Sequence, residues 1–171
     1  MAAFIAILVD DERLKELGKL FEEYGYEPPP LLHVTILFLG DVSGIYLHRI
    51  VDALAKRTFV APKKLKVVGY ELFPPGKETN IVLLVDEPKL MELRNQVLNL
   101  VKPVKEDRFE YRPHVTIARR ARSPSKEVAK RVAKLLEELW RSGRVPRSIT
   151  CRSLALIKSA RGAYEIVARL S

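Results

Sequence analysis

Two short segments of the chain carry the same pair of polar side chains at the same spacing. His33-Val34-Thr35-Ile36 recurs unchanged as His114-Val115-Thr116-Ile117, and these segments hold two of the three histidines. Alternate side chains of an extended strand point to opposite faces, so each copy presents its His and Thr together. A His exchanges protons near neutral pH, and a Thr hydroxyl can hydrogen-bond an oxyanion. Two such faces opposed across a cleft would place an acid and a base around one phosphate group.

The elements that must position these side chains follow the same order in both halves of the chain. The first half is expected to contain a strand at 3–9, a helix from Asp10 or Asp11 to about Tyr24, a motif strand at 31–39, a helix at 45–57 and a strand at 65–72. The second half repeats this order with a strand at 81–85, a helix at 90–101, a motif strand at 113–118, a helix at 125–142 and a strand at 148–158. A last strand is expected at 164–170.

A second repeat supports a relation between the halves. Residues 9–17 align with residues 85–93, and five of the nine positions are identical. In both segments a strand passes into a capped helix. We therefore expect one α/β (α+β) domain over residues 1–171, bilobal, with two pseudo-symmetric halves of about 1–78 and 79–171. Sheets should flank a central cleft, with helices outside. Pseudo-two-fold packing of the halves would bring His33 and His114 together.

These motifs resemble those of a known family, the two-histidine phosphoesterases, and within it the 2'-5' RNA ligase or RNA 2',3'-cyclic phosphodiesterase group. That family carries two copies of His-hydrophobic-Thr-hydrophobic. Residues 32–41, Leu-His-Val-Thr-Ile-Leu-Phe-Leu-Gly-Asp, are similar to its first motif with the Phe-Leu-Gly end. Residues 113–119, Pro-His-Val-Thr-Ile-Ala-Arg, are similar to its second motif with the preceding Pro and the following Arg.

The resemblance implies a bilobal fold and a site that needs neither ATP nor metal. It implies hydrolysis of RNA ends that bear a 2',3'-cyclic phosphate, such as tRNA-derived ends, to 2'-phosphomonoesters. The reverse direction would join two ends through a 2'-5' linkage. It assigns His33 as proton donor and His114 as proton acceptor, with Thr35, Thr116 and Arg119 binding the phosphoryl oxygens. No cofactor is expected, since the sequence contains neither a phosphate-binding Gly-x-x-x-x-Gly-Lys loop nor a Gly-x-Gly-x-x-Gly run.

Composition limits the alternatives. The single cysteine, Cys151, can form neither an internal disulfide nor a cysteine metal cluster, which fits a reducing cytoplasm. The apolar run at 2–9 lacks a basic leader and is too short to span a membrane. Zinc binding by the two motif histidines is not favoured, because no nearby Cys or third His completes a site. We expect a cytoplasmic monomer.

The positive charge is concentrated after the second motif begins. Residues 112–152 account for the whole formal charge of +9, because they contain twelve Lys or Arg and three Glu. The charge indicates either a solvated helix surface or a polyanion-binding surface, and the sequence leaves both open. The basic residues in question are Arg122, Lys126, Lys130 and Lys134.

Several single positions also have two interpretations. Strict alternation from His114 places Arg120 rather than Arg119 beside it, unless a bulge or strand end follows Ala118. Tyr46, Phe73 and Tyr111 could stack on a base or could simply be packing residues. His48 is expected to be an ordinary surface residue.

The motif side chains could also have purely structural roles. Either motif histidine could be a hydrogen-bonded structural residue, and both threonines suit a strand in any case. At the level of the whole protein, the alternatives are an RNA-binding or nucleotide-binding module without turnover and a phosphodiesterase for another small cyclic phosphate. The duplication of the complete motif favours the enzyme.

Overall fold

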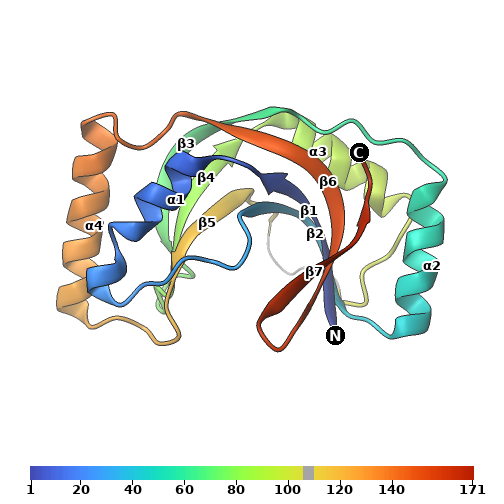
Figure 1. Ribbon diagram of the computed structural model, residues 1–171, viewed down its shortest axis with the longest axis horizontal. Helices are drawn as coiled ribbons and strands as arrows, with labels where there is room; N and C mark the ends of the chain where they lie inside the picture. Colours follow the sequence, from blue (N-terminus) through green and yellow to red (C-terminus); the bar gives the residue numbers. More distant parts are fainter. Residues whose placement is uncertain (106–109) are drawn as a thin grey trace.

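The computed structural model describes residues 1–105 and 110–171. Within these residues, seven antiparallel strands form one strongly curved sheet. The strand order is β1-β2-β5-β4-β3-β6-β7, and β1 also pairs with β6, which closes the first six strands into a ring. Figure 1 shows the sheet as an arch, with α1 and α4 at one end and α2 and α3 at the other. The α+β class predicted from the sequence is confirmed.

The elements follow the predicted order closely. The strands are β1 (Ala2–Val9), β2 (His33–Asp41), β3 (Lys64–Phe73), β4 (Asn80–Asp86), β5 (His114–Arg119), β6 (Ser148–Ala160) and β7 (Ala163–Arg169). The helices are α1 (Glu12–Lys19), α2 (Gly44–Ala55), α3 (Pro88–Leu98) and α4 (Lys126–Arg141), with a short 3₁₀ helix η1 at Glu22–Tyr24. The order β1-α1-β2-α2-β3 therefore recurs as β4-α3-β5-α4-β6, and β7 is added at the end.

Each α-helix begins at a side chain that accepts a hydrogen bond from its own first turn. Asp11, Ser43, Glu87 and Ser125 cap α1, α2, α3 and α4 in this way. These bonds satisfy donors that have no partner within the helix. Short polar residues in front of amphipathic segments therefore explain where the helices start.

The first helix is shorter than its sequence pattern suggests. We expected it to reach about Tyr24, but α1 ends at Lys19 and the chain continues through η1 to Gly25, whose φ of 84° is left-handed. Phe21 and Tyr26 on either side of this turn are almost completely buried. A straight continuation of the helix would carry the chain away from the strands against which these two aromatic side chains pack.

The two sequence halves are interleaved in space. Helix α1 of the first half packs on β5, and α3 of the second half packs on β2. At the first contact, a Cβ added to Gly18 would lie 2.4 Å from the carbonyl oxygen of Ile117, so only glycine fits. At the second, Nη1 of Arg94 donates to the carbonyl oxygen of Ile36 at 2.8 Å. Each motif strand is thus supported by the helix of the other half.

The main core lies between the sheet and its helices. It takes Ile5 and Ile7 from β1, Val34 and Ile36 from β2, Leu83 from β4 and Val115 and Ile117 from β5, together with the inward faces of the four α-helices. A smaller cluster on the opposite face of the sheet joins Phe4, Ala6 and Leu8 of β1 with Ala155 and Ile157 of β6. The second cluster matters for function because His33 lies against it. Among the described residues, no helix is both long and apolar enough to cross a membrane.

Candidate active site

The two motif strands meet at the centre of the sheet. β2 and β5 pair through Val34 and Val115 in antiparallel register. This register places His33 across from Thr116 and His114 across from Thr35, since opposed residues of neighbouring strands share a face. Val34 and Val115 are fully buried, whereas the two His and two Thr side chains are partly exposed. The fold thus brings the predicted residues into one group of four on the face opposite the main core.

His33 lies in an aromatic enclosure. The ring of Phe4 is 5.0 Å from the imidazole, and the ring of Tyr164 approaches edge-on at 5.8 Å. Burial lowers the pKa of His33 below its ordinary value, against the opposing effect of a hydrogen bond to the Leu31 carbonyl. The nearby charges of His114 and Arg119 lower it further. The register of β2, β5 and β4 places His114 and Arg119 on the same face as His33.

Both motif histidines are oriented by the same backbone contact. Nδ1 of His33 lies 2.8 Å from the carbonyl oxygen of Leu31, and Nδ1 of His114 lies 2.9 Å from that of Arg112. A carbonyl can only accept, so Nδ1 carries the hydrogen in both rings. This arrangement leaves both Nε2 atoms available for proton exchange. In both cases the carbonyl belongs to the residue two positions before the histidine, so the same contact recurs in the two halves of the chain.

A bulge in β5 decides which arginine shares the histidine face. Against β4, Thr116 pairs with Val82 but Ala118 pairs with Ile81, so the register shifts by one residue between them. Ile117 and Ala118 are consequently both buried. Alternation restarts after the bulge and returns Arg119 to the face of His114 and Thr116. Arg119 was expected on this face only if a bulge or strand end followed Ala118. The bulge lies at Ile117 and Ala118, one position earlier than expected.

The neighbouring Arg120 is held elsewhere. Its Nη1 donates to the carbonyl oxygen of Tyr24 at 2.7 Å, and its guanidinium lies 5.4 Å from the ring centre of Tyr26. These contacts attach the loop after α1 to the end of β5. Arg120 therefore acts in the packing of that loop.

The first motif strand contains a matching bulge. Against β1, Thr35 pairs with Ala6 but Leu37 pairs with Ile5, and Ile36 and Leu37 are both buried. The residue that returns to the histidine face is Phe38, which is 47% exposed. The position five residues after the histidine is thus a phenylalanine in β2 and an arginine in β5.

Two side chains from the second half of the chain donate hydrogen bonds to the backbone of the first motif. The Tyr111 hydroxyl donates to the carbonyl oxygen of Thr35 at 2.6 Å. Arg94 donates to the next carbonyl, that of Ile36, and its guanidinium also lies 4.8 Å from the Tyr111 ring centre. β2 and β5 diverge at this point, so these side chains satisfy acceptors that strand pairing leaves open. Sequence analysis missed Arg94, because its partner Ile36 lies 58 positions away and no local pattern marks the contact.

A cavity of about 450 Å³ opens beside His114 and Thr35. Its apolar lining consists of Phe73, Pro74, Pro75, Val82, Leu84 and Tyr111. The Phe73 ring lies 5.2 Å from the His114 ring. Two of the three candidate stacking residues, Phe73 and Tyr111, therefore reach the site. The third, Tyr46, is on α2, where its hydroxyl donates to the carbonyl oxygen of Lys102.

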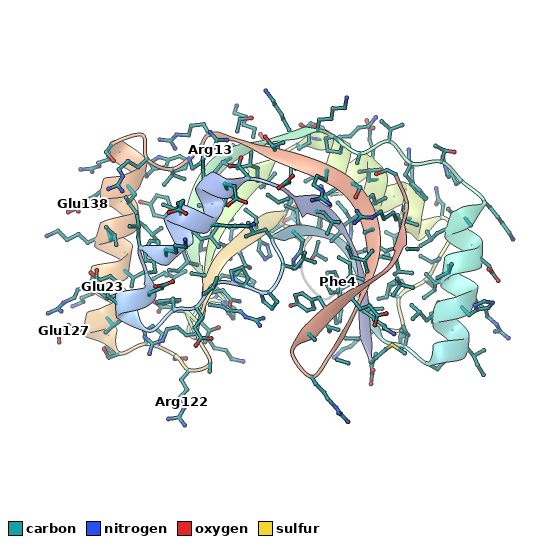
Figure 2. The ribbon with its side chains drawn as sticks, in the orientation of Figure 1. Phe4, Arg13, Glu23, Arg122, Glu127 and Glu138 are labelled. Atoms are coloured by element: carbon teal, nitrogen blue, oxygen red, sulfur yellow. The ribbon has the colours of Figure 1, made fainter. Side chains whose placement is uncertain are left out.

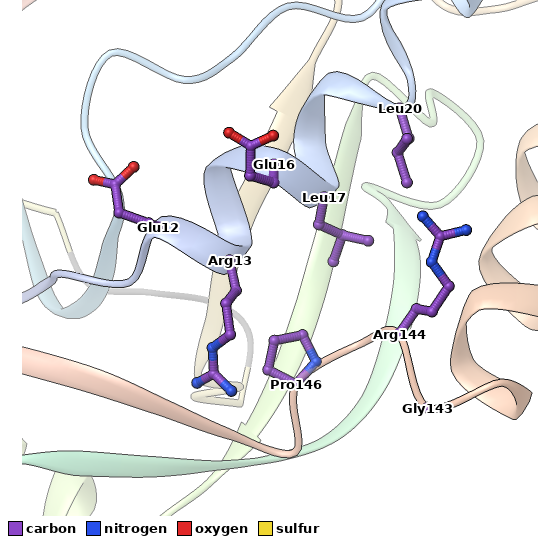
Figure 3. A pocket seen from close by; sticks show the side chains of 8 residues that line it. All are labelled: Glu12, Arg13, Glu16, Leu17, Leu20, Gly143, Arg144 and Pro146. Atoms are coloured by element: carbon purple, nitrogen blue, oxygen red, sulfur yellow. The ribbon is translucent and has the colours of Figure 1, made fainter.

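Other predicted residues lie outside this group. His48 is exposed on α2, 3.8 Å from Asp52. The basic residues Arg122, Lys126, Lys130 and Lys134 are exposed, and Figure 2 shows Arg122 extending into solvent beyond the N-terminal end of α4. A further cavity of about 470 Å³ lies between α1 and the segment after α4, where Arg13, Glu16 and Arg144 line it (Figure 3). That cavity includes no residue of either motif.

The site as a whole belongs to a recognisable class. Two imidazoles, two hydroxyls and one guanidinium lie on a single face, and these are the groups that an acid–base phosphoesterase needs. A family model for the 2'-5' RNA ligase superfamily matches residues 9–163. The chain therefore belongs to the 2'-5' RNA ligase superfamily, a family of cyclic phosphodiesterase and 2'-5' RNA ligase type enzymes.

Comparison with individual proteins agrees with this assignment. An RNA 2',3'-cyclic phosphodiesterase of Archaeoglobus fulgidus is 34% identical over 149 residues, which cover 81% of this chain and 82% of the relative. A crystal structure of a Thermus thermophilus protein aligns with a TM-score of 0.65 at 21% identity, covering 99% of this chain and 97% of the other. E. coli LigT complexed with phosphate aligns with a TM-score of 0.59 at 18% identity, covering 98% and 94%. The two structural matches show a shared fold.

Proposed function

We propose that this protein hydrolyses RNA 2',3'-cyclic phosphate ends to 2'-phosphomonoesters. The observation that carries the proposal is the pairing of Val34 with Val115, which brings two complete His and Thr sets onto one face. The relative from Archaeoglobus fulgidus, named for this activity, supports the choice of substrate.

The group of four supplies what the ring opening requires. A water oxygen attacks phosphorus while the bond from phosphorus to O3' breaks, which leaves the phosphate on O2'. One imidazole takes the proton of the water, and the other gives a proton to O3'. General acid and base catalysis of this kind contributes roughly 10² to 10⁴-fold for each group. Thr35 and Thr116 would donate to the non-bridging oxygens, and Arg119 would stabilise their developing negative charge.

The direction of proton transfer has two assignments. The resemblance to the family makes His33 the donor and His114 the acceptor. The burial of His33 lowers its pKa and favours the neutral, proton-accepting form in the free enzyme, which supports the reverse assignment. A bound phosphate would raise the pKa of either imidazole, so the substrate complex decides between them.

A substrate with sulfur in place of O3' distinguishes the assignments. A thiolate leaves without protonation, so the variant that lacks the proton donor should regain activity on this substrate. Rescue of His33→Ala would support the assignment by resemblance. Rescue of His114→Ala would support the reverse.

The same residues could also join two RNA ends. A 5'-hydroxyl would take the place of water, attack the cyclic phosphate and displace O3', which forms a 2'-5' linkage without ATP. The two imidazoles would keep their roles, because the 5'-hydroxyl loses a proton and O3' gains one, as in hydrolysis. This ligation activity is part of the proposal.

The test is incubation with a nucleoside 2',3'-cyclic phosphate in the presence of EDTA and without ATP, followed by chromatographic separation of the 2'- and 3'-phosphate products. We expect the 2'-phosphate alone. His33→Ala and His114→Ala should lose this activity. His48→Ala is their matched control, because His48 is exposed on α2. Unchanged substrate together with tight RNA binding would instead identify a binding module, and preferential turnover of another small cyclic phosphate would redirect the substrate assignment.

A further inference from the structure

We propose that the cavity beside His114 binds the nucleobase of the nucleoside whose cyclic phosphate is opened. This inference rests on the proposed function and adds to it a place for the base. The cavity is lined by Thr35 and His114 and by neither His33 nor Thr116. A nucleotide with its phosphate on the group of four can therefore extend its base to the His114 side.

The size and walls of the cavity suit a flat heterocycle. Its volume of about 450 Å³ lies within the range usual for small-molecule sites. Phe73 offers an aromatic surface next to His114, and Val82 and Leu84 of β4 form the floor. Aromatic side chains stack on bases of any identity. The walls therefore favour a base without demanding a particular one.

The Tyr111 side chain, which forms one wall of the cavity, is held in place by two contacts. The hydroxyl donates to the Thr35 carbonyl, and the Arg94 guanidinium lies over the ring. A wall that is already ordered loses little conformational entropy when a ligand binds. The same contact links the cavity to the backbone of the motif that carries His33.

The charges of the described residues around the cavity favour an uncharged occupant over a phosphate. Among these residues, two carboxylates, Glu71 and Glu110, line the cavity together with one cation, Arg112. Arg112 already lies 2.8 Å from Glu71 in an ion pair. An anion would be repelled by the remaining negative charge, whereas the N–H groups of a base would be attracted. The phosphate should therefore stay beside Arg119 and the uncharged base should enter the cavity.

Glu71 is the residue we expect to bind the polar edge of the base. A carboxylate offers about four acceptor positions, and Arg112 occupies one side of it. Oε2 of Glu71 is buried and lies against Nη1 of Arg112. Oε1 is therefore the oxygen that can accept a hydrogen bond from a base in the cavity.

The experiment compares cytidine 2',3'-cyclic phosphate with methyl ribofuranoside 2',3'-cyclic phosphate, which has the same reacting group and no base. We expect the wild-type kcat/KM to be about tenfold or more higher for the cytidine substrate. Leu84→Trp, which fills the cavity from a partly exposed position, should lower kcat/KM more for the cytidine substrate than for the base-less substrate and so remove this preference. Equal kcat/KM values of the wild type for the two substrates would overturn the proposal.

A second variant tests the role of Glu71. Glu71→Gln keeps the shape of the side chain and removes its charge, so KM for the cytidine substrate should rise roughly tenfold with kcat and the base-less substrate unchanged. Glu165→Gln is the matched control, because Glu165 is also a strand glutamate in an ion pair, with Lys158 of the neighbouring strand. An equal effect of both variants, or an effect on the base-less substrate, would contradict the role of Glu71.

Binding measurements separate this inference from the proposed function. If neither substrate is turned over, calorimetry with cytidine 2'-phosphate and methyl ribofuranoside 2-phosphate still reports on the cavity. Preference for the cytidine ligand that Leu84→Trp abolishes would support the base site while the hydrolysis proposal fails. Equal binding of the two ligands would overturn the base site independently of turnover.

Discussion

The two motif strands have identical core residues and different surroundings. In β2, His33 is enclosed by Phe4 and Tyr164, whereas in β5, His114 lies beside the open cavity. The position after the bulge is Phe38 in β2 and Arg119 in β5. A repeated sequence therefore provides two equivalent imidazoles, and unrepeated neighbours make them chemically different. Acid–base catalysis needs such a difference, because the two groups must hold opposite protonation states.

The support behind the two strands differs in the same way. Helix α1 contacts the bulge of β5 directly at Gly18, whereas α3 contacts the bulge of β2 through the long side chain of Arg94. Tyr111 adds a second hydrogen bond on the β2 side. We infer that β5 is held by close packing and β2 by polar contacts. The four predictions below test this comparison.

The largest effect is expected from removing the histidines. His33→Ala, His114→Ala and the double variant should each lose roughly 10² to 10⁴-fold in kcat, with similar values for all three, because both groups act in one step. Steady-state kinetics on a nucleoside cyclic phosphate is the measurement. Losses that multiply in the double variant would show that the two histidines act independently.

A smaller but global effect is expected at Gly18. In Gly18→Ala the new Cβ would clash with the Ile117 carbonyl, so α1 must move away from β5. Overpacking of this kind should lower the free energy of unfolding by about 1–3 kcal/mol, which urea denaturation measures. Gly44→Ala is the control, because nothing lies within 4 Å of its added Cβ. Equal stability of both variants would refute the close contact.

Loss of the Tyr111 hydroxyl should have a local effect. Tyr111→Phe removes the hydrogen bond to the Thr35 carbonyl and should cost about 1 kcal/mol of stability. Tyr46→Phe removes a similar bond to the Lys102 carbonyl, far from the motifs, at a similar cost. If the bond positions Thr35, only Tyr111→Phe should also lower kcat. Parallel kinetics of the two variants would limit Tyr111 to a structural role.

The smallest effect concerns the pKa of His33. Burial lowers this pKa, so Tyr164→Ala, which opens one side of the enclosure, should raise it towards the ordinary value. The protonated fraction of His33 near pH 6 should rise accordingly. NMR titration resolves this directly, since the chain has three histidines. Tyr70 lies on β3 and packs against Trp140, so Tyr70→Ala should leave the His33 titration unchanged. An unchanged titration in Tyr164→Ala would show that the enclosure does not cause the lowered pKa of His33.

Much of the fold could be predicted because its signals are local. Caps, proline breaks and apolar periodicity located every α-helix and strand to within a few residues, apart from the end of α1. That helix ends early because Phe21 and Tyr26 must both enter the core. Local signals do not report such long-range packing.

The candidate site was predicted unevenly for the same reason. His33, His114, Thr35 and Thr116 follow from the repeat, and alternation places each His and Thr on one face. The contacts of Arg94 and Tyr111 with β2 carried no sequence signal, since they join residues 58 and 76 positions apart. The catalytic and binding roles of all these residues remain predictions.

The sequence by itself determined the duplicated chemistry, because residue identity and strand periodicity are local properties. Only the tertiary structure decided how the copies meet and differ. The pairing of Val34 with Val115 aligned them, the bulge at Ile117 and Ala118 turned Arg119 onto the histidine face, and Phe4 with Tyr164 enclosed one imidazole. These outcomes depend on register and packing between distant segments, which a linear pattern does not encode.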